Sequence, residues 1–408
     1  MNATLAYLDP GSGSALLAAM FAVVTASLYS LKALYYKILG KQVSSKVGSD
    51  TPILFSEGKS YYTSFEPIIN ELIRRKIHFR YVSLDMHDPA LMIESEYMHS
   101  KLYSRSGLGF AKIEGLQAPL MLATTPHIGA DSYPLARPRK VKHLVHFFHD
   151  YVAGTYYRLG GLDHYDVVIS TGEYCREYLE RVEEKRQTPK KEIIALGLPY
   201  VDTLSAQLAQ VAKPAKTDEK KTILVAPSWG MKGCLNNYGT AFIKDLIKQG
   251  YQVIIRLHSH SYIAEPQKVA QWKTELSQTG AVWDEDIYST NSMLQADVLI
   301  SDTSSIRFDF AFLHLKPVIT LDIPQASRAD FEASYHEKTW DMIMEHQIGA
   351  VVTQEKISEL PEIIKQVLEN YDSQRLQDLR DHHVVNFGQC AKPIVSFLEE
   401  LKNRKIEA

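Results

Sequence analysis

Residues 300–322 read ISDTSSIRFDFAFLHLKPVITLD. The pattern is that of a buried strand, a polar junction, a helix and a second buried strand. The junction is DTSS, residues 302–305, and Asp309 follows it about one turn later inside an otherwise apolar helix. Two strands of one sheet that are joined through a helix form a βαβ unit, in which the strands run parallel. This stretch therefore predicts an α/β fold built on a parallel sheet.

Candidate strands recur along the whole chain, and segments with helical periodicity separate them. The stretch AQVAKPAKTDEKK at 209–221 interrupts this alternation and is typical of an exposed connector. We therefore expect two facing Rossmann-like domains, at 46–211 and 222–408, with a linker at 212–221 and a helical tail on the second domain. The candidate strands are 51–58, 77–84, 118–126, 143–150, 165–174, 192–199, 222–229, 251–259, 296–301, 317–322 and 349–353.

The composition is that of a globular protein. The chain has 408 residues, 45% hydrophobic and 23% charged, which suits two domains of ordinary size. A formal net charge of -3 gives no general attraction to nucleic acid, so no nucleic-acid partner is expected and anion binding must be local. Cys175, Cys234 and Cys390 are widely separated and odd in number. They argue against a disulfide framework or a zinc ribbon and for a reducing compartment.

The N-terminal segment differs in character from the rest. Residues 15–31, ALLAAMFAVVTASLYSL, carry no charge, and Lys32, Lys37 and Lys41 follow. This length approaches that of a membrane-spanning helix, and lysines on the C-terminal side alone place the following domains in the cytoplasm. We expect residues 1–45 to form a single-span anchor and juxtamembrane segment in the cytoplasmic membrane. The alternative is a hydrophobic helix that lies on the bilayer or packs on a partner.

Three polar segments are predicted to meet at one edge of the second sheet. APSWG (226–230), RLHSHSY (256–262) and the DTSS junction each follow a strand, and ligands of parallel sheets bind outside the carboxyl ends of the strands. The amides at a helix N-terminus suit a phosphate, although the DTSS hydroxyls could also serve as ordinary helix caps. Asp309 could bind a ribose or be merely solvated. The candidate donor-site residues are Ser228, Arg256, Ser301, Asp302, Thr303, Ser304, Ser305 and Asp309.

The candidate catalytic residue of the first half is His149. It ends the strand pattern HLVHFFHD (143–150), next to Asp150 and on the side of the expected cleft between the domains. Histidine titrates near neutral pH and is a natural general base, while an ordinary loop histidine is the plain alternative. His258 and His260 have no evident third ligand nearby, so no metal site is predicted.

The DTSS segment also carries a family resemblance. SDTSSIRFDFAFLHLKPVI resembles the SDxSSxxFDxxxLxKPxI signature of the CDP-glycerol glycerophosphotransferase family, which builds teichoic-acid-like poly(glycerol phosphate). Weaker similarities occur in the same order. FFHDYVAGTYYRLGGLD is similar to WHGTPLKKLG, DVVISTGEYCREYL to DYxxSxSxxxxExL, GLPYVD to GxPRND, APSWG to APTWR, and RLHSHS to RxHP. Asp150 stands where the family has glycine, and Tyr200 stands where it has arginine.

The resemblance implies a GT-B type fold and roles for individual residues. His149 takes the position of the family's catalytic histidine, and His258 that of a second histidine on the nucleotide phosphates. Ser304 and Ser305 take the positions of the diphosphate-binding serines, and Asp309 would lie near the ribose. No metal or other cofactor is expected.

The expected function is transfer of glycerol phosphate, or a related polyol phosphate, from a CDP-linked donor. The acceptor would be a lipid-linked or polymeric hydroxyl, and CMP would leave. One alternative is a GT-B glycosyltransferase that uses a nucleotide sugar in cell-surface polysaccharide synthesis. The other is a non-catalytic, membrane-anchored scaffold.

Overall fold

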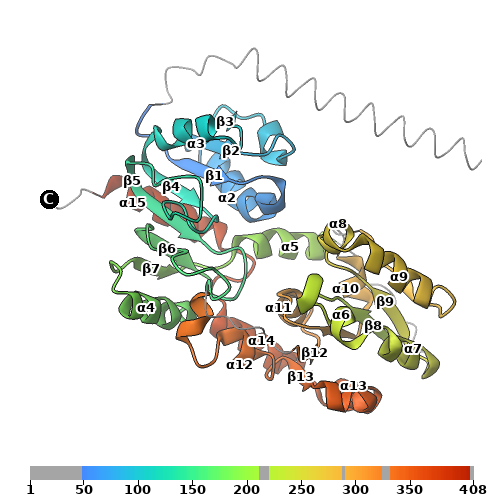
Figure 1. Cartoon of the computed structure of the whole chain (residues 1–408). Coiled ribbons are helices and arrows are strands. Elements are labelled where there is room, and N and C mark those ends of the chain that lie inside the picture. Colours follow the sequence, from blue (N-terminus) through green and yellow to red (C-terminus); the bar gives the residue numbers. More distant parts are fainter. Residues whose placement is uncertain (1–47, 211–219, 287–289, 324–330, 405–408) are drawn as a thin grey trace, which may run out of the picture.

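The computed structural model describes residues 48–210, 220–286, 290–323 and 331–404. Figure 1 shows these residues folded into two α/β domains, the N-terminal one coloured blue to green and the C-terminal one yellow to orange-red. Each domain contains one sheet with helices packed against it, and loops of the two domains meet between them. The predicted pair of facing Rossmann-like domains is therefore confirmed.

The N-terminal domain is built on a seven-stranded sheet in the order β3-β2-β1-β4-β5-β6-β7, in which every neighbouring pair is parallel. Helices cover both faces, so strands such as β1 and β6 are buried along their whole length. Its strands are β1 (Ile53–Ser56), β2 (Phe79–Ser83), β3 (Met98–Leu102), β4 (Gln117–Ala123), β5 (Lys140–Phe147), β6 (Val167–Ser170) and β7 (Glu192–Ala195). Its helices are η1 (Lys59–Tyr61), α2 (Tyr62–Arg74), η2 (Pro89–Met92), α3 (Gly107–Glu114), α4 (Tyr174–Arg186) and α5 (Pro199–Gln210).

The C-terminal domain is built on a six-stranded parallel sheet in the order β10-β9-β8-β11-β12-β13. Its strands are β8 (Thr222–Val225), β9 (Gln252–Ile255), β10 (Val282–Trp283), β11 (Val298–Ser301), β12 (Val318–Leu321) and β13 (Gly349–Val352). Its helices are η3 (Gly230–Lys232), α6 (Cys234–Tyr238), α7 (Ala241–Lys248), α8 (Ser261–Ala264), α9 (Pro266–Leu276), α10 (Asn291–Gln295), α11 (Ile306–Leu313), η4 (Glu332–Tyr335), α12 (Trp340–Met344), η5 (Gln354–Glu359), α13 (Leu360–Asn370) and α14 (Ser373–His383).

The strand orders fix where ligands can bind. Both sheets contain the doubly wound order, in which the chain first builds outward on one side of the first strand and then on the other. The reversal leaves a crevice at the carboxyl ends of β1 and β4 in the N-terminal domain, and of β8 and β11 in the C-terminal domain. Ligands of this fold class bind at such switch points, so these two edges are the places to examine.

The last helix corrects the predicted domain boundary. The sequence assigned all of 222–408 to the C-terminal domain, but α15 (Ala391–Asn403) packs on α2 and β4 of the N-terminal domain. Its apolar face, which includes Ile394 and Leu398, joins the core on that side of the N-terminal sheet. Asp202 of α5 accepts the backbone N–H groups of Cys390 and Ala391 at 3.0 and 2.9 Å and so caps α15. Most of the expected linker at 212–221 lies outside the described residues, because residues 211–219 are not among them.

A shared apolar core joins the two domains. Trp340 of α12 stacks on Tyr174 of α4 with ring centroids 4.5 Å apart. Tyr151, which follows β5, packs against Phe308 and Phe312 of α11 at 5.6 and 5.7 Å. Contacts of this kind hold the domains close together on the side of the cleft where α11 lies.

The predicted membrane anchor lies outside the described residues. In the described part of the chain, which starts at residue 48, none of the helices combines the length and the apolar character that a membrane crossing requires.

Candidate active site

Asp302 organises the switch point of the C-terminal domain. Its side chain is fully buried, and its carboxylate accepts the backbone N–H of Ser228 at 2.9 Å, of Cys234 at 2.6 Å and of Ser304 at 3.2 Å. The first donor belongs to the loop after β8, the second is the first residue of α6, and the third belongs to the loop after β11. Burial raises the pKa of Asp302, and these hydrogen bonds and the nearby Arg307 oppose that rise. Asp302 therefore fixes the backbone that forms this edge of the sheet. The prediction that Asp302 contacts a ligand directly is corrected, because its side chain is buried.

Ser301 is a second correction. It is completely buried at the end of β11, and its hydroxyl donates to the carbonyl oxygen of Ala226 at 2.6 Å. This bond ties the end of β11 to the end of β8. A side chain that is buried and engaged in this way cannot reach a ligand in the cleft, so its role is to hold the two strand ends together.

Thr303, Ser304 and Ser305 form the partly exposed surface of this edge. Helix α11 begins at Ile306, and Ser305 occupies the N-cap position without a side-chain capping bond. The ordinary capping function that the sequence left open is therefore not used here. The peptide of Ser304 is held at both ends, because its N–H bonds Asp302 and its carbonyl accepts the Nε–H of Arg307 at 3.1 Å. The result is a rigid junction with accessible hydroxyls.

Arg307 supports this junction and was not predicted as a site residue. Its side chain is 1% exposed and forms an ion pair with Glu345 at 2.7 Å. It also donates to the Thr320 hydroxyl at 3.2 Å. An arginine next to the apolar positions of a helix was the only sequence signal. Its buried guanidinium therefore holds the Ser304 carbonyl, just before the start of α11.

Arg256 and His258 follow β9 at the same edge. The Arg256 guanidinium bonds Asp284 and Ser292, each at 3.3 Å, and is partly buried. His258 is exposed, and its Nδ1 accepts the backbone N–H of His260 at 3.1 Å. That bond leaves the ring proton on Nε2, so a neutral His258 can still donate to an anion. Partial desolvation, and then the neighbouring His260, lower the pKa of His258.

His149 stands in the other half of the site, two residues past the end of β5. Its Nδ1 lies 2.8 Å from the hydroxyl of Thr124, the first residue after β4. The ring also packs edge-on against Tyr61 of η1, with centroids 5.2 Å apart at 80°. Residues that follow β1, β4 and β5 in the sequence therefore meet at one imidazole. Tyr61 and Thr124 were both missed, since neither carries a sequence signal of its own.

Asp150 does not hold the imidazole of His149. Its carboxylate accepts the backbone N–H of Val152 at 3.1 Å and stabilises its own turn. Burial raises the pKa of Asp150, and the adjacent His149 opposes the rise. Asp150, which stands where the resembling family has glycine, therefore stabilises the loop and does not hydrogen-bond the ring of His149.

Asp309 joins the two domains. Its carboxylate accepts the hydroxyl of Tyr200 from α5 at 2.6 Å. Burial raises the pKa of Asp309 from 3.8 to about 6, against the opposing hydrogen bond of Tyr200. Tyr200, which stands where the resembling family has arginine, thus supplies the partner of this carboxylate.

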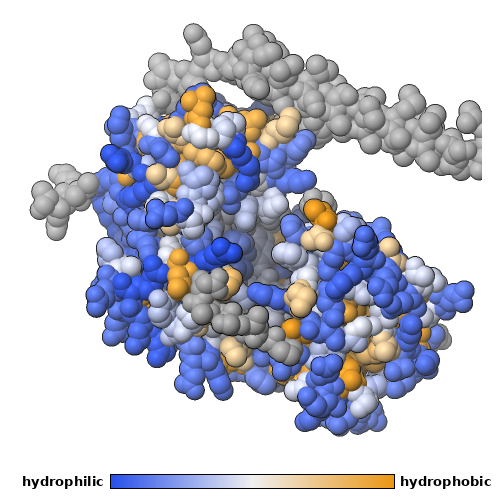
Figure 2. Space-filling view, viewed as in Figure 1, coloured by the Kyte–Doolittle hydropathy of each residue, from blue (hydrophilic) through white to orange (hydrophobic). Residues whose placement is uncertain are grey.

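The two halves meet in a cleft. Tyr151 lies two residues after His149 and packs on Phe308, which lies in the first turn of α11 and three residues after Ser305. The His149 loop and the DTSS junction are therefore neighbours across the domain boundary. Figure 2 shows the surface hollowed between the two domains, with mainly hydrophilic residues around the hollow.

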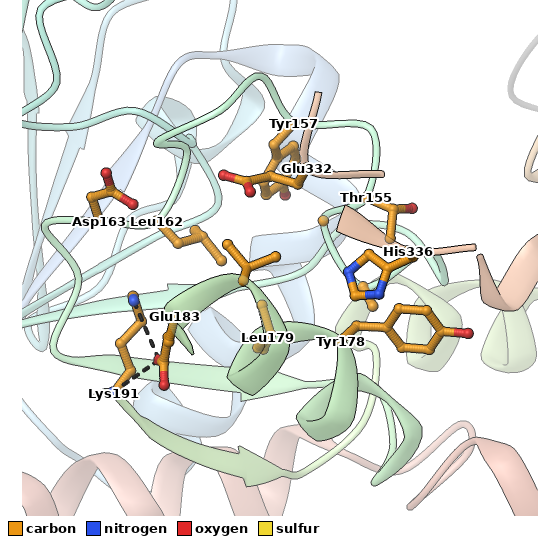
Figure 3. Close-up of a pocket in the computed structure, with 13 residues that line it drawn as sticks. Thr155, Tyr157, Leu162, Asp163, Tyr178, Leu179, Glu183, Lys191, Glu332 and His336 are labelled. Carbon is orange, nitrogen blue, oxygen red and sulfur yellow. Dashed lines mark hydrogen bonds and ion pairs between the residues drawn. The ribbon is translucent and has the colours of Figure 1, made fainter. Parts of the chain in front are cut away.

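A separate enclosed cavity lies between α4 and η4. Figure 3 shows its lining, which includes the ion pair of Lys191 and Glu183 at 3.3 Å. Its volume of about 20 Å³ has room for roughly one water molecule, far less than a nucleotide needs. Glu332 accepts the Gly160 N–H at 2.8 Å on its wall. The cavity belongs to the seam between the domains and is not a substrate site.

Comparison with known protein families shows which family the chain belongs to. The family model described as CDP-Glycerol:Poly(glycerophosphate) glycerophosphotransferase matches residues 153–397, more than half of the sequence. The chain belongs to this glycerophosphotransferase family. The match contains all the C-terminal residues described above, whereas Thr124, His149 and Asp150 precede it. No curated protein sequence matches the chain significantly.

Solved structures with the same fold support the architecture of this glycerophosphotransferase family member. A putative UDP-N-acetylglucosamine 2-epimerase from Listeria monocytogenes has a TM-score of 0.58 at 12% identity, covering 88% of this chain and 99% of its own. The Neisseria meningitidis UDP-GlcNAc 2-epimerase bound to UDP-GlcNAc has a TM-score of 0.53 at 14% identity, covering 86% and 99%. Anabaena Alr3699/HepE in complex with UDP and glucose has a TM-score of 0.52 at 12% identity, covering 87% and 100%. At these identities the likeness shows the GT-B type fold alone.

The raised pKa of Asp309 leads us to expect that the stability of this glycerophosphotransferase family member depends on pH. Its folded-state pKa of about 6 lies above the ordinary value of 3.8. A raised carboxyl pKa favours the folded state at low pH, and this contribution is lost as the pH rises from 3.8 through 6. Asp309→Asn keeps an acceptor for Tyr200 without the charge. We expect it to gain up to about 3 kcal/mol of stability over the wild type between pH 4 and pH 8.

Urea unfolding at several pH values measures this difference. Asp322→Asn, at an exposed carboxyl after β12, is the matched control and should follow the wild-type curve. Parallel stability curves for Asp309→Asn and the wild type between pH 4 and pH 8 would contradict the assignment.

Proposed function

We propose that the protein transfers glycerol phosphate, or a related polyol phosphate, from a CDP-linked donor to the hydroxyl of a lipid-linked or polymeric acceptor, with release of CMP. The observation that carries the proposal is the meeting of two loops across the cleft. The loop of His149 packs through Tyr151 on α11, whose first turn follows the Ser304–Ser305 hydroxyls. A proton-accepting side chain and a rigid anion-binding junction are the two elements that this reaction requires.

The donor binds the C-terminal half in this proposal. The diphosphate lies against Ser304, Ser305 and the amides at the start of α11, and the Nε2–H of His258 donates to a phosphoryl oxygen. Ser228 lies on the facing loop, and its own N–H is already fixed by Asp302. Asp309 is committed to Tyr200 in the free protein, so a ribose hydroxyl would have to share or replace that bond.

The chemistry is a substitution at phosphorus. The acceptor oxygen attacks the phosphorus that carries the glycerol group, the bond from that phosphorus to the CMP oxygen breaks, and CMP leaves. His149 takes the proton of the acceptor hydroxyl on Nε2. Negative charge on the phosphoryl oxygens and on the leaving CMP is stabilised by fixed donors at the DTSS junction and by His258. No metal or other cofactor is part of this proposal.

The place of action is also a proposal. An apolar run at residues 15–31, followed by lysines, supports attachment to the cytoplasmic membrane with both domains in the cytoplasm. Such an attachment would bring the cleft to an acceptor that is itself linked to lipid.

Donor binding to the full-length chain tests the proposal. We expect CDP-glycerol or CDP-ribitol to raise the melting temperature, because a ligand at 100 times its Kd adds about 2.7 kcal/mol to the stability of the native state. With an acceptor present, CMP should be released. The double variant Ser304→Ala/Ser305→Ala should lose most of the shift, while the exposed Ser277→Ala should keep it.

The alternatives give different results in the same assay. Release of UDP from a UDP-sugar would identify a nucleotide-sugar glycosyltransferase. An absence of binding by every cytidine nucleotide would overturn the proposal and favour a non-catalytic scaffold.

A further inference from the structure

Thr124 is placed to act on His149 rather than to stabilise the sheet. It is the first residue after β4, it is fully buried, and its hydroxyl lies 2.8 Å from Nδ1 of His149. Strands β4 and β5 pair in parallel with Ala123 opposite His146, so the segments that follow the two strands leave the sheet side by side. Among the described residues, the hydroxyl makes no other hydrogen bond.

The imidazole is fixed at two independent points. Thr124 holds Nδ1, and the edge-on packing of Tyr61 restricts rotation of the ring plane. Without the hydrogen bond, rotation about the Cβ–Cγ bond by half a turn would exchange a ring nitrogen for a carbon. When Thr124 holds Nδ1, Nε2 is the nitrogen that remains for a substrate. No described residue forms a hydrogen bond with Nε2.

A hydroxyl suits this position because of the proton that the reaction moves. When Nε2 accepts a proton, Nδ1 must carry its own hydrogen, and the hydroxyl oxygen accepts it. The same bond persists in the imidazolium, where both nitrogens are donors. The carboxylate of Asp150, the next residue in the sequence, accepts the Val152 N–H and makes no hydrogen bond to Nδ1.

We propose that Thr124 is a positioning residue that accepts the Nδ1–H of His149 and so presents the Nε2 lone pair to the acceptor hydroxyl. The reaction part of this proposal rests on the proposed function. The tautomer and orientation of the ring do not, because they are properties of the free protein. Thr124 lies outside the residues that the family model matches, so the family assignment does not imply it.

Other charged or titratable groups also face this histidine. Asp150 is adjacent in sequence and interacts electrostatically with His149. His146, fully buried on β5, has a lowered pKa because of burial, and His149 and His127 add to the effect. The pKa of Tyr61 is raised by burial and by Glu57. None of these groups is altered by a substitution at position 124, so they act equally in every variant compared.

The decisive variant is Thr124→Val, which keeps the shape of the side chain and removes its hydroxyl. We expect kcat for CMP release to fall about 10- to 100-fold with little change in the donor KM, because the base is misplaced and the donor site is untouched. Thr124→Ser should recover activity to within about threefold. The acid limb of the pH profile should move to lower pH in Thr124→Val, since the imidazolium loses an acceptor.

Thr125→Val is the matched control. Thr125 is the next residue, is 1% exposed, and its hydroxyl has no partner among the described residues. Only its carbonyl is used, as the acceptor of Tyr165, and the substitution keeps it. Thr125→Val should leave kcat, KM and the pH profile unchanged.

A measurement on the free protein separates this proposal from the proposed function. The ¹⁵N signals of His149 in full-length, histidine-labelled protein, identified by their loss in His149→Gln, report which nitrogen carries the hydrogen. We expect the Nδ1–H form in the wild type and in Thr124→Ser, and a mixture in Thr124→Val. An Nε2–H ring in the wild type, or a spectrum that Thr124→Val leaves unchanged, would overturn the proposal even if CMP release were observed.

Discussion

Replacement of His149 by alanine should lower kcat by about 10²- to 10⁴-fold, the usual contribution of a general base. The imidazole of His149 is held at the N-terminal switch point by Thr124, which follows β4, and by Tyr61 of η1, which follows β1. The donor site lies in the other domain, so the donor Kd should change by less than about threefold. Single-turnover CMP release measures the first quantity, and a thermal-shift titration with CDP-glycerol measures the second.

Two comparisons make this result specific. His346→Ala removes an exposed histidine beyond α12 and should have no effect on either quantity. His149→Gln retains a hydrogen-bonding side chain but has no base, so it should be as impaired as His149→Ala. Retention of kcat within tenfold in both His149 variants would remove His149 from the mechanism and would leave the general base to another group.

The parts of the fold that the sequence predicted are those with a strong apolar signal. Strands such as β1 and β11 are completely buried, so their residues form short hydrophobic runs that are easily recognised. The βαβ unit at 300–322 was predicted because its helix and both flanking strands bury apolar side chains.

The missed elements lack that signal. Strand β3 buries only Met98 among its five residues, because it is an edge strand with an exposed outer side. Helix α15 was assigned to the wrong domain. Its amphipathic sequence pattern indicates that one face packs against other elements, but it does not indicate which domain those elements belong to. Its docking depends on Asp202, which lies nearly 190 residues before it, a distance over which no local pattern can report.

The candidate site divides in the same way. The sequence located the edge of the C-terminal sheet, because each loop follows a recognisable strand. The sequence could not distinguish exposed from buried side chains within the DTSS junction and the residue before it. Ser301 and Asp302 face inward, whereas Ser304 and Ser305 are partly exposed. Thr124 gave no sign at all, since its significance exists only through a side chain 25 residues away.

The remaining large effect is expected at Asp302, where it tests how the donor site is built. Asp302→Ala removes the acceptor of three backbone N–H groups, which lie in the loop after β8, at the start of α6 and in the loop after β11. Each unsatisfied group costs about 1–3 kcal/mol when buried, and two of the three are only partly buried. We therefore expect a total loss of roughly 2–4 kcal/mol, or about 5–10 °C in Tm, together with loss of CDP-glycerol binding by at least about 100-fold.

Asp302→Asn separates organisation of the loops from folding of the domain. It keeps one acceptor oxygen but turns an amide N–H₂ toward backbone donors, so it should lose less stability while still impairing donor binding. Asp245→Ala, at a side chain on α7 that is 62% exposed, controls for the loss of a carboxylate and should behave as the wild type. Far-ultraviolet circular dichroism verifies that each variant is folded at the assay temperature. If folded Asp302→Asn binds CDP-glycerol as tightly as the wild type, the loops after β8 and β11 do not need Asp302 to form the donor site, and the geometry of the DTSS junction must arise from Arg307 and the strand ends alone.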